Sequence, residues 1–280
     1  DYWADKLRQK FYASTATALC GANGRYIEMD YQETLMYGDV MAMAKKKLND
    51  FTLDIAIGGS INDKVVNSTR IDSKNASLKF ANVFNLANIV MSSSASIDQK
   101  IDAHYQLQSV FATAQAGYKE GIFLDLTARN DWSSTLAYTK YEKKGFFYPS
   151  IGVSFLPDKW VKMPEWVSFS KLRGAYSIVG NGVPPFITYP VSYVTAGGGM
   201  LASDAAPFAE MKPEMTHSVE LGMEWKFLQH RLGLNLTYYR TNTYEQFFKL
   251  PALAGDKYAY RYVNAGDIQN QGWEITLDAT

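Results

Sequence analysis

The sequence of 280 residues contains little of what disulfide-bonded proteins and metalloenzymes use. Its one cysteine, Cys20, cannot form a disulfide within the chain and is most simply a small buried apolar residue. The three histidines, His104, His217 and His230, lie far apart and in no His-x-x-x-His pattern, so we expect no metal site. Nucleophile elbows, phosphate-cradling loops and dinucleotide fingerprints are also missing. These absences predict a protein that is not an enzyme and has no cofactor.

The sequence also has no excess of charge of either sign and no long apolar run. The 28 acidic and 28 basic residues give a formal net charge of zero, so we expect no nucleic-acid partner. No segment approaches the roughly 18 apolar residues of a transmembrane helix. Aromatic residues, in contrast, are abundant at 14% of the chain, which suits the girdles of a membrane barrel or a surface that stacks on sugars.

The main positive signal is alternation of apolar and polar residues with a period of two. It is clearest between Met215 and Arg240, where two such segments flank the short break 228–230, and it recurs at 51–58, 122–129 and 273–278. Successive side chains of a strand point to opposite faces, so each segment has one apolar and one polar face. The two segments between Met215 and Arg240 are each about as long as the roughly 9–11 residues with which a tilted strand crosses a bilayer.

Alternation alone does not tell which face points outward, because a soluble barrel would turn its apolar face inward. Strand length, aromatic content and charge on the polar face favour a lipid-facing barrel with a hydrated lumen. Glu220 and Glu224 would lie about 13 Å apart along one strand, farther than the roughly 5–10 Å of a glycosidase pair. We therefore interpret such charges as lumen-lining; the candidates are Asp125, Arg129, Glu220, Glu224, Lys226 and Glu274.

Alternation and turn signals together define the expected organisation. We expect strands near residues 24–35, 51–60, 101–118, 122–130, 146–155, 169–180, 216–227, 231–247 and 268–280. Tight turns at 119–121 and 228–230 contrast with long links at 61–100, 131–145, 181–215 and 248–267, as in outer-membrane barrels. The stretch 36–50 fits least well, because residues 41–47 also suit a helical turn.

Tyrosines of the long links are candidate substrate-binding residues, because binding residues usually lie on loops carried by a rigid scaffold. Their rings can stack on sugars or hold peptide side chains, and packing within the loops is the alternative role. The candidates are Tyr189, Tyr193, Tyr258, Tyr260 and Tyr262.

Five segments, taken in order, resemble the motifs of one known family. Residues 126–134 (LTARNDWSS) resemble a strand-to-loop signature, and residues 147–155 (FYPSIGVSF) resemble an "FPS" strand. Three further motifs are matched by residues 170–181 (SKLRGAYSIVGN), by Lys212-Pro213-Glu214 with Glu220-Leu221-Gly222, and by residues 263–274 (VNAGDIQNQGWE). In this order the motifs resemble those of the SusC/RagA-like TonB-dependent transporters. Residues 1–100 match more loosely. Asn130, Trp132 and Ser177 depart from the usual residues.

The resemblance implies an all-β fold: part of a large antiparallel transmembrane β-barrel, 22-stranded in the family, in the cell outer membrane. It further implies an N-terminal plug and a TonB-contacting segment, neither of which is visible here, so we expect residues 1–280 to be an incomplete, internal portion of one barrel domain. The implied partners are TonB, outer-membrane lipid and a SusD-like surface lipoprotein that caps the barrel. The implied function is active import of oligosaccharides or oligopeptides, and the sequence does not distinguish these substrates.

Two alternatives stay open at this stage. One is a siderophore- or cobalamin-type TonB receptor that works without a lipoprotein cap. The other is a β protein that does not transport, such as a soluble carbohydrate-binding domain or an adhesin. A cap partner would separate the two kinds of receptor, and detergent dependence would separate both from the soluble protein.

Overall fold

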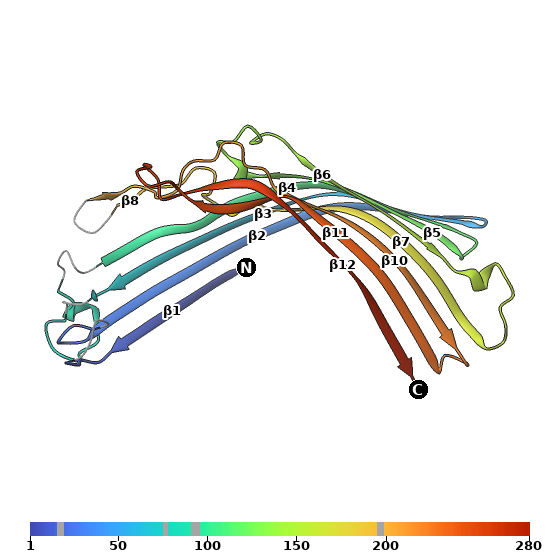
Figure 1. The fold of residues 1–280 in the computed structure, drawn as a ribbon, viewed down its shortest axis with the longest axis horizontal. Coiled ribbons are helices and arrows are strands. Elements are labelled where there is room, and N and C mark those ends of the chain that lie inside the picture. Colours follow the sequence, from blue (N-terminus) through green and yellow to red (C-terminus); the bar gives the residue numbers. More distant parts are fainter. Residues whose placement is uncertain (16–19, 75–77, 91–95, 195–198) are drawn as a thin grey trace.

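Ten long strands form one antiparallel sheet in which each strand pairs with its neighbour along the chain (Figure 1). The computed structural model describes residues 1–15, 20–74, 78–90, 96–194 and 199–280. The strands of the sheet, in spatial order, are β1 (Tyr2–Phe11), β2 (Arg25–Leu48), β3 (Phe51–Asp72), β4 (Ser96–Tyr118), β5 (Ile122–Ser133), β6 (Phe146–Phe155), β7 (Val167–Asn181), β10 (Glu214–Phe227), β11 (Leu232–Pro251) and β12 (Tyr260–Ala279). A small separate pair, β8 (Tyr193–Val194) and β9 (Met200–Leu201), lies between β7 and β10 in the chain.

Helical structure is minor in the described part of the chain. It comprises three 3₁₀ turns of three residues each, η2 (Leu86–Asn88), η3 (Ser134–Leu136) and η4 (Pro157–Lys159). Among the described residues, no helix has the length and apolar character needed to span a bilayer. The prediction of an all-β, antiparallel fold is confirmed.

The connections at the two ends of the sheet differ in length (Figure 1). One end, here called the turn end, has tight connections at 49–50, 119–121 and 228–231 and a medium one at 156–166. The other, the loop end, has the links 12–24, 73–95, 134–145, 182–213 and 252–259. The expected division into short turns and long links is therefore present, although several links are shorter than predicted because the strands extend farther.

The turn end is built from residues in left-handed backbone conformations. Lys119 and Glu120 have φ of 49° and 53°, and Leu228, Gln229 and His230 have φ of 52°, 58° and 67°. Positive φ at the centre of a hairpin matches the right-handed twist of the flanking strands, so these turns close tightly even without glycine at the centre. This geometry sets the register of β4 with β5 and of β10 with β11.

Two segments of the N-terminal region form strands that the sequence did not predict. Residues 36–50 are not a link with a helical turn: β2 runs through to Leu48 and pairs residue by residue with β3, and the chain turns at Asn49 and Asp50. The strand β1 was not predicted, because Lys6, Arg8 and other polar residues occupy both of its faces. In both segments, cross-strand pairing overrides weak local preference.

Buried apolar residues gather at the loop end rather than within the sheet. Tyr26, Leu78 and Ile89 form one cluster between β2 and the link 73–95. Leu136, Val183 and Met211 form a second, which joins the links 134–145 and 182–213. These two clusters fix the long links against the sheet and against each other.

Candidate functional site

The register of the strands brings all six predicted lumen residues to one face of the sheet. Asp125 lies opposite Gly152, which lies opposite Ala175. Ala175 in turn lies opposite Glu220. Directly opposite residues share a face, and so do residues two or four apart in a strand. By the same rule Arg129, Glu224, Lys226 and Glu274 share this face, called here the polar face.

Side chains of the polar face contact one another from strand to strand. Lys45 pairs with Asp54 at 2.9 Å, and the Gln115 amide donates to Asp125 at 2.6 Å. Because these four residues lie in one row across β2 to β5, the row is continuous. Lys45 offsets the charge of Asp54, and Asp125 keeps its negative charge beside the neutral amide of Gln115.

A second group on the polar face surrounds Arg173 of β7. Its guanidinium donates to Glu220 of β10 at 3.2 Å and to Thr237 of β11 at 2.7 Å. Farther along β5, Arg129 donates to Asp131 and Ser109, each at 2.7 Å. The sequence proposed Arg129 and Glu220 individually, but it did not identify Arg173, which links three strands.

The opposite face is apolar, and it is exposed. Ile57 is 62% exposed and Leu221 is 57% exposed. On the polar face, Asp54, Arg129 and Glu224 are half-buried. A soluble sheet covers its apolar face with a second layer, so this arrangement is the reverse of a soluble fold. It is the division that a lipid-facing barrel wall requires.

The apolar face forms a band that stops abruptly toward the loop end. On β11, Leu236 and Tyr238 are followed on the same face by Arg240 and Asn242. On β12, Gln269 and Gln271 precede Trp273, Ile275 and Leu277. On β4, Gln106 and Gln108 precede Val110. We call this face, from the turn end to these boundaries, the apolar band. The strands β2, β3 and β4, of 24, 22 and 23 residues, extend well beyond it.

Aromatic side chains line the apolar band at the turn end. Tyr118 packs against Phe51 at a ring-centroid distance of 4.6 Å and against Trp160 at 5.6 Å. Trp166 stacks on Phe227 at 5.6 Å. Amphipathic rings at the edge of an apolar band form the girdle found at membrane–water interfaces. The high aromatic content seen in the sequence is thus partly explained.

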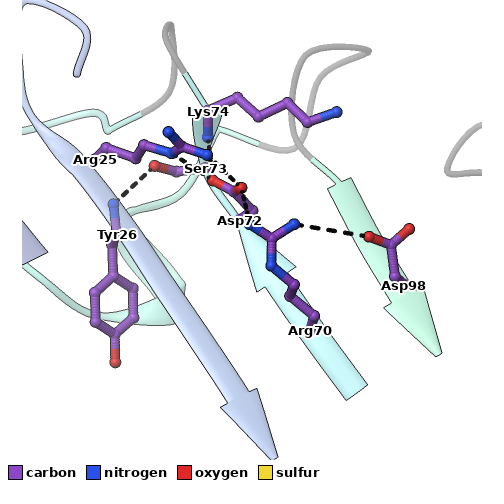
Figure 2. A network of polar contacts seen from close by, with 7 residues as sticks. All are labelled: Arg25, Tyr26, Arg70, Asp72, Ser73, Lys74 and Asp98. Atoms are coloured by element: carbon purple, nitrogen blue, oxygen red, sulfur yellow. Dashed lines mark hydrogen bonds and ion pairs between the residues drawn. The ribbon is translucent and has the colours of Figure 1, made fainter. Parts of the chain in front are cut away.

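At the loop end, a buried carboxylate holds the ends of β2 and β3 together (Figure 2). Asp72, the last residue of β3 and 1% exposed, accepts hydrogen bonds from Arg25 and Arg70, each at 2.6 Å. The backbone N–H of Lys74 also donates to it, and Ser73 accepts from the N–H of Tyr26. In Figure 2 the side chains of Arg25 and Arg70 converge on Asp72 from both strands, so the network is a strand clasp rather than an open binding site.

The surroundings of Asp72, which lies above the apolar band, stabilise its charged form. Burial alone would raise the pKa of this carboxyl. Hydrogen bonds from Arg25 and Lys74 and the charges of Arg25 and Arg70 outweigh that effect and lower the pKa to about 2. The clasp is therefore charged at any pH near neutrality.

Three of the sequence motifs meet in a second network, which we call the latch. Asn264 donates to the carbonyls of Glu245 at 2.6 Å and Lys212 at 3.1 Å, and it accepts from the Lys212 N–H at 3.0 Å. Glu214 accepts from the Asn181 side chain at 3.1 Å and from the Phe247 N–H at 3.2 Å. The latch thus joins both ends of the link 182–213 to β11 and β12.

Glu245 makes the latch possible through an irregular backbone. Its φ is 57°, and the pairing of β11 with β12 shifts register on both sides of Gln246. Such a bulge turns the strand and frees a carbonyl for a partner outside the ladder. The Glu245 carboxylate also pairs with the Lys212 ammonium at 2.5 Å, which raises the pKa of Lys212.

The structure places the candidate tyrosines in three settings. Tyr189, in the link 182–213, is 55% exposed. Tyr258 lies in the link 252–259, but Tyr260 and Tyr262 do not lie in a link as expected: they belong to β12, where they contact each other at 5.8 Å. Lys249 lies 3.6 Å from the centroid of the Tyr260 ring. The side chain of Tyr193 lies outside the described part of the structure.

No grouping of at least three His, Cys, Asp or Glu side chains suited to a metal ion occurs among the described residues. The described Cys20 is buried, and its thiol donates to the Tyr12 carbonyl at 3.2 Å. The polar face offers hydrogen-bonding and charged groups along a surface.

An exposed apolar band, an aromatic girdle and a hydrogen-bonded polar face together define the wall of an outer-membrane β-barrel. The family model described as "TonB dependent receptor-like, beta-barrel" matches residues 1–280. The chain belongs to this family, whose members are outer-membrane proteins, and the resemblance seen in the motifs is confirmed.

Curated relatives carry the same family name. The chain is 26% identical over 184 residues to TonB-dependent receptor P3 of Formosa agariphila, covering 62% of this chain and 18% of that protein. It is 27% identical over 186 residues to TonB-dependent receptor P26 of the same organism, covering 63% and 18%. The chain thus spans about a fifth of the length of these relatives.

Solved structures with the same fold include the RagAB peptide transporter. It has a TM-score of 0.83 and 17% identity, covering 99% of this chain and 31% of that one. The ferric enterobactin receptor PfeA of Pseudomonas aeruginosa has a TM-score of 0.52 and 15% identity, covering 98% and 38%. At these identities the likeness concerns the fold.

Proposed function

We propose that this chain is part of the barrel wall of a TonB-dependent importer that carries oligosaccharides or oligopeptides across the outer membrane. The observation that carries the proposal is the two-faced sheet: an exposed apolar band on one side and a hydrogen-bonded polar face on the other. In a closed barrel, the polar face would line the lumen. Strands pairing with β1 and β12 would close the barrel and remove its open edges.

The six polar-face candidates would act as wall charges rather than as tight binding residues. Asp125 and Glu220 are already engaged by Gln115 and Arg173. A wall whose charged groups are paired offers a passing solute many weak hydrogen bonds and no tight binding site. Such a wall suits the passage of a polar solute and does not call for catalysis. We therefore infer a protein that is not an enzyme.

The partners follow from the two ends of the sheet. We propose that the loop end faces the exterior and meets a SusD-like lipoprotein, and that TonB acts from the periplasmic side. The long links and the extension of β2, β3 and β4 beyond the apolar band support this orientation, because outer-membrane barrels carry their long loops outside. The likeness to the RagAB peptide transporter supports a capped importer, and its described cargo supports a peptide as one of the two substrate classes.

A siderophore-type receptor is the second candidate. The TM-score to the RagAB transporter is 0.83, compared with 0.52 for the enterobactin receptor. The higher score favours the capped importer. A soluble carbohydrate-binding or adhesin protein is disfavoured by the exposed apolar band.

Affinity purification of the full-length protein from detergent-solubilised outer membrane tests the proposal. Mass spectrometry should identify a lipoprotein in stoichiometric amount, and deletion of TonB should abolish growth on the imported nutrient. A folded, detergent-stable barrel without a lipoprotein would instead support the uncapped receptor. A protein that stays soluble without detergent would contradict both.

A further inference from the structure

Two exposed tyrosines from different links lie against each other at the loop end. Tyr138 of the link 134–145 and Tyr189 of the link 182–213 have ring centroids 4.8 Å apart and ring planes inclined by 36°. Tyr138 is 70% exposed and Tyr189 is 55% exposed. Aromatic pairs that serve only packing are normally buried, since burial is what stabilises them. This pair leaves most of its surface to solvent.

The backbone beneath the pair is rigidly braced. The Thr188 hydroxyl, next to Tyr189, donates to the carbonyl of Ala137, next to Tyr138, at 3.0 Å. The Lys140 N–H donates to the Ala209 carbonyl at 3.1 Å. Below these bonds, Leu136 packs with Val183 and Met211 in the buried cluster that joins the two links. The two rings are thus held at a fixed spacing by contacts in which neither ring takes part.

Tyr138 occupies a backbone conformation that aromatic residues rarely adopt. Its φ is 64°, and Phe186 in the facing link has a φ of 65°. The Tyr138 N–H donates to the Glu142 carboxylate at 3.0 Å, which helps to hold this conformation. Strained residues persist where the surrounding structure fixes them, and they concentrate at ligand-binding sites. Here the strain turns an aromatic ring outward.

Two charged groups of the link 134–145, Lys140 and Glu142, are engaged within the links. Lys140 pairs with Glu210, and it also lies 5.2 Å from the Tyr141 ring centroid. Glu142 is occupied by the Tyr138 N–H. The pair presents ring faces and hydroxyl groups, and neither Lys140 nor Glu142 is free to bind a ligand beside it. A neutral ring with apolar C–H faces and hydroxyl edges fits such a surface, whereas a peptide terminus would require a free opposite charge.

We infer that Tyr138 and Tyr189 form an aromatic platform that binds a ring of a neutral oligosaccharide. The inference rests on the proposed importer function and selects one of its two substrate classes. It also assigns a role to Tyr138, which the sequence analysis did not identify, and gives Tyr189 a partner. The platform lies on the links, so it would act in capture before the solute reaches the polar face.

The test is binding by the full-length protein in detergent, together with any partner that copurifies. The probes are an array of neutral and acidic oligosaccharides and a library of short peptides. The variants are Tyr138→Asn, Tyr189→Ala and the double variant; asparagine tolerates positive φ, so the first removes the ring without adding strain. Tyr12→Ala is the matched control, because Tyr12 is 67% exposed and packs against Phe84 in other links.

We expect the parent protein to bind neutral oligosaccharides. Each single variant should weaken this binding by about tenfold or more. Tyr12→Ala should bind as the parent protein does. The inference is overturned if no neutral oligosaccharide binds, if binding survives in the double variant, or if the variants weaken peptide binding instead. Binding in detergent does not depend on TonB, so these outcomes are distinguishable from a failure of TonB-dependent import.

Discussion

Adjacent residues of β11 face opposite environments, which makes this strand a direct test of the facing assignment. Leu236 lies on the apolar band, opposite Met223 and Ile275. Asn235 lies on the polar face, opposite Glu224 and Thr276. An arginine in the lipid-facing middle of a barrel strand costs about 2–4 kcal/mol. On the polar face, the same arginine would gain a carboxylate neighbour.

We therefore expect Leu236→Arg to reduce the amount of heat-modifiable, folded protein in the outer membrane, whereas Asn235→Arg should assemble like the parent. Gel mobility with and without heating, combined with membrane fractionation, measures this. Equal tolerance of arginine at both positions would show that neither face meets lipid.

At Asp72, a single carboxyl determines how the loop end responds to acid. Its pKa of about 2 in the folded protein lies below the roughly 3.9 of an unfolded aspartate. A carboxyl with a lowered pKa stabilises the fold above the unfolded pKa, and that stabilisation is lost as the pH falls through the folded pKa. The clasp should therefore hold unchanged from neutral pH to about pH 4 and weaken only toward pH 2.

Asp72→Asn should speed hydrogen exchange at the ends of β2 and β3 at pH 7, corresponding to about 2–3 kcal/mol of local stability. Asp98→Asn is the control, because Asp98 is more exposed and lies 4.0 Å from Arg70. If both variants exchange alike, Asp72 is not the centre of the clasp.

At the scale of elements, the latch determines how the link 182–213 is attached to the sheet. Asn264 makes three hydrogen bonds to backbone groups of residues 212 and 245, and these bonds have no replacement if the amide is removed. Asn270 lies in the same strand and the same motif, but its side chain is exposed. Asn264 and Asn270 are the same residue type in the same strand, so Asn270 is a matched control for the hydrogen bonds of Asn264.

Asn264→Ala should cost about 2–3 kcal/mol locally, because partly buried backbone groups lose their partners. Limited proteolysis within the link 182–213 should become at least about tenfold faster, while the strands stay resistant. Asn270→Ala should leave the cleavage rate unchanged. A cleavage rate that responds to neither substitution would mean that the buried cluster, and not the latch, secures the link.

At the scale of the whole molecule, much of the sheet was predictable and most of its contacts were not. Period-two alternation identified the strands that cross the apolar band, because burial on one face requires it. The second half of β2 was missed, since Met41–Lys47 has good helix formers and three lysines, and only pairing with β3 makes it a strand.

The sites depend on residues far apart in the chain. Local pattern contained no sign that Lys212, Glu245 and Asn264 meet, nor that Tyr138 lies against Tyr189. The motifs marked where some of these residues are, and the register and bulges of the sheet determine which ones touch. Positive φ at Tyr138 and Glu245 is equally invisible in sequence, because tertiary contacts impose it on residues that do not favour it.

The central claim is that the apolar face meets lipid and the polar face meets water. Single cysteine substitutions at residues 52–57 of β3 test this claim. They are made one at a time in the full-length protein, with Cys20→Ser as the background. Each variant is then treated with a water-soluble maleimide in intact outer membranes. We predict labelling at 52, 54 and 56, on the polar face, and protection at 53, 55 and 57, on the apolar band. Uniform labelling, or labelling of the odd positions alone, would contradict the account.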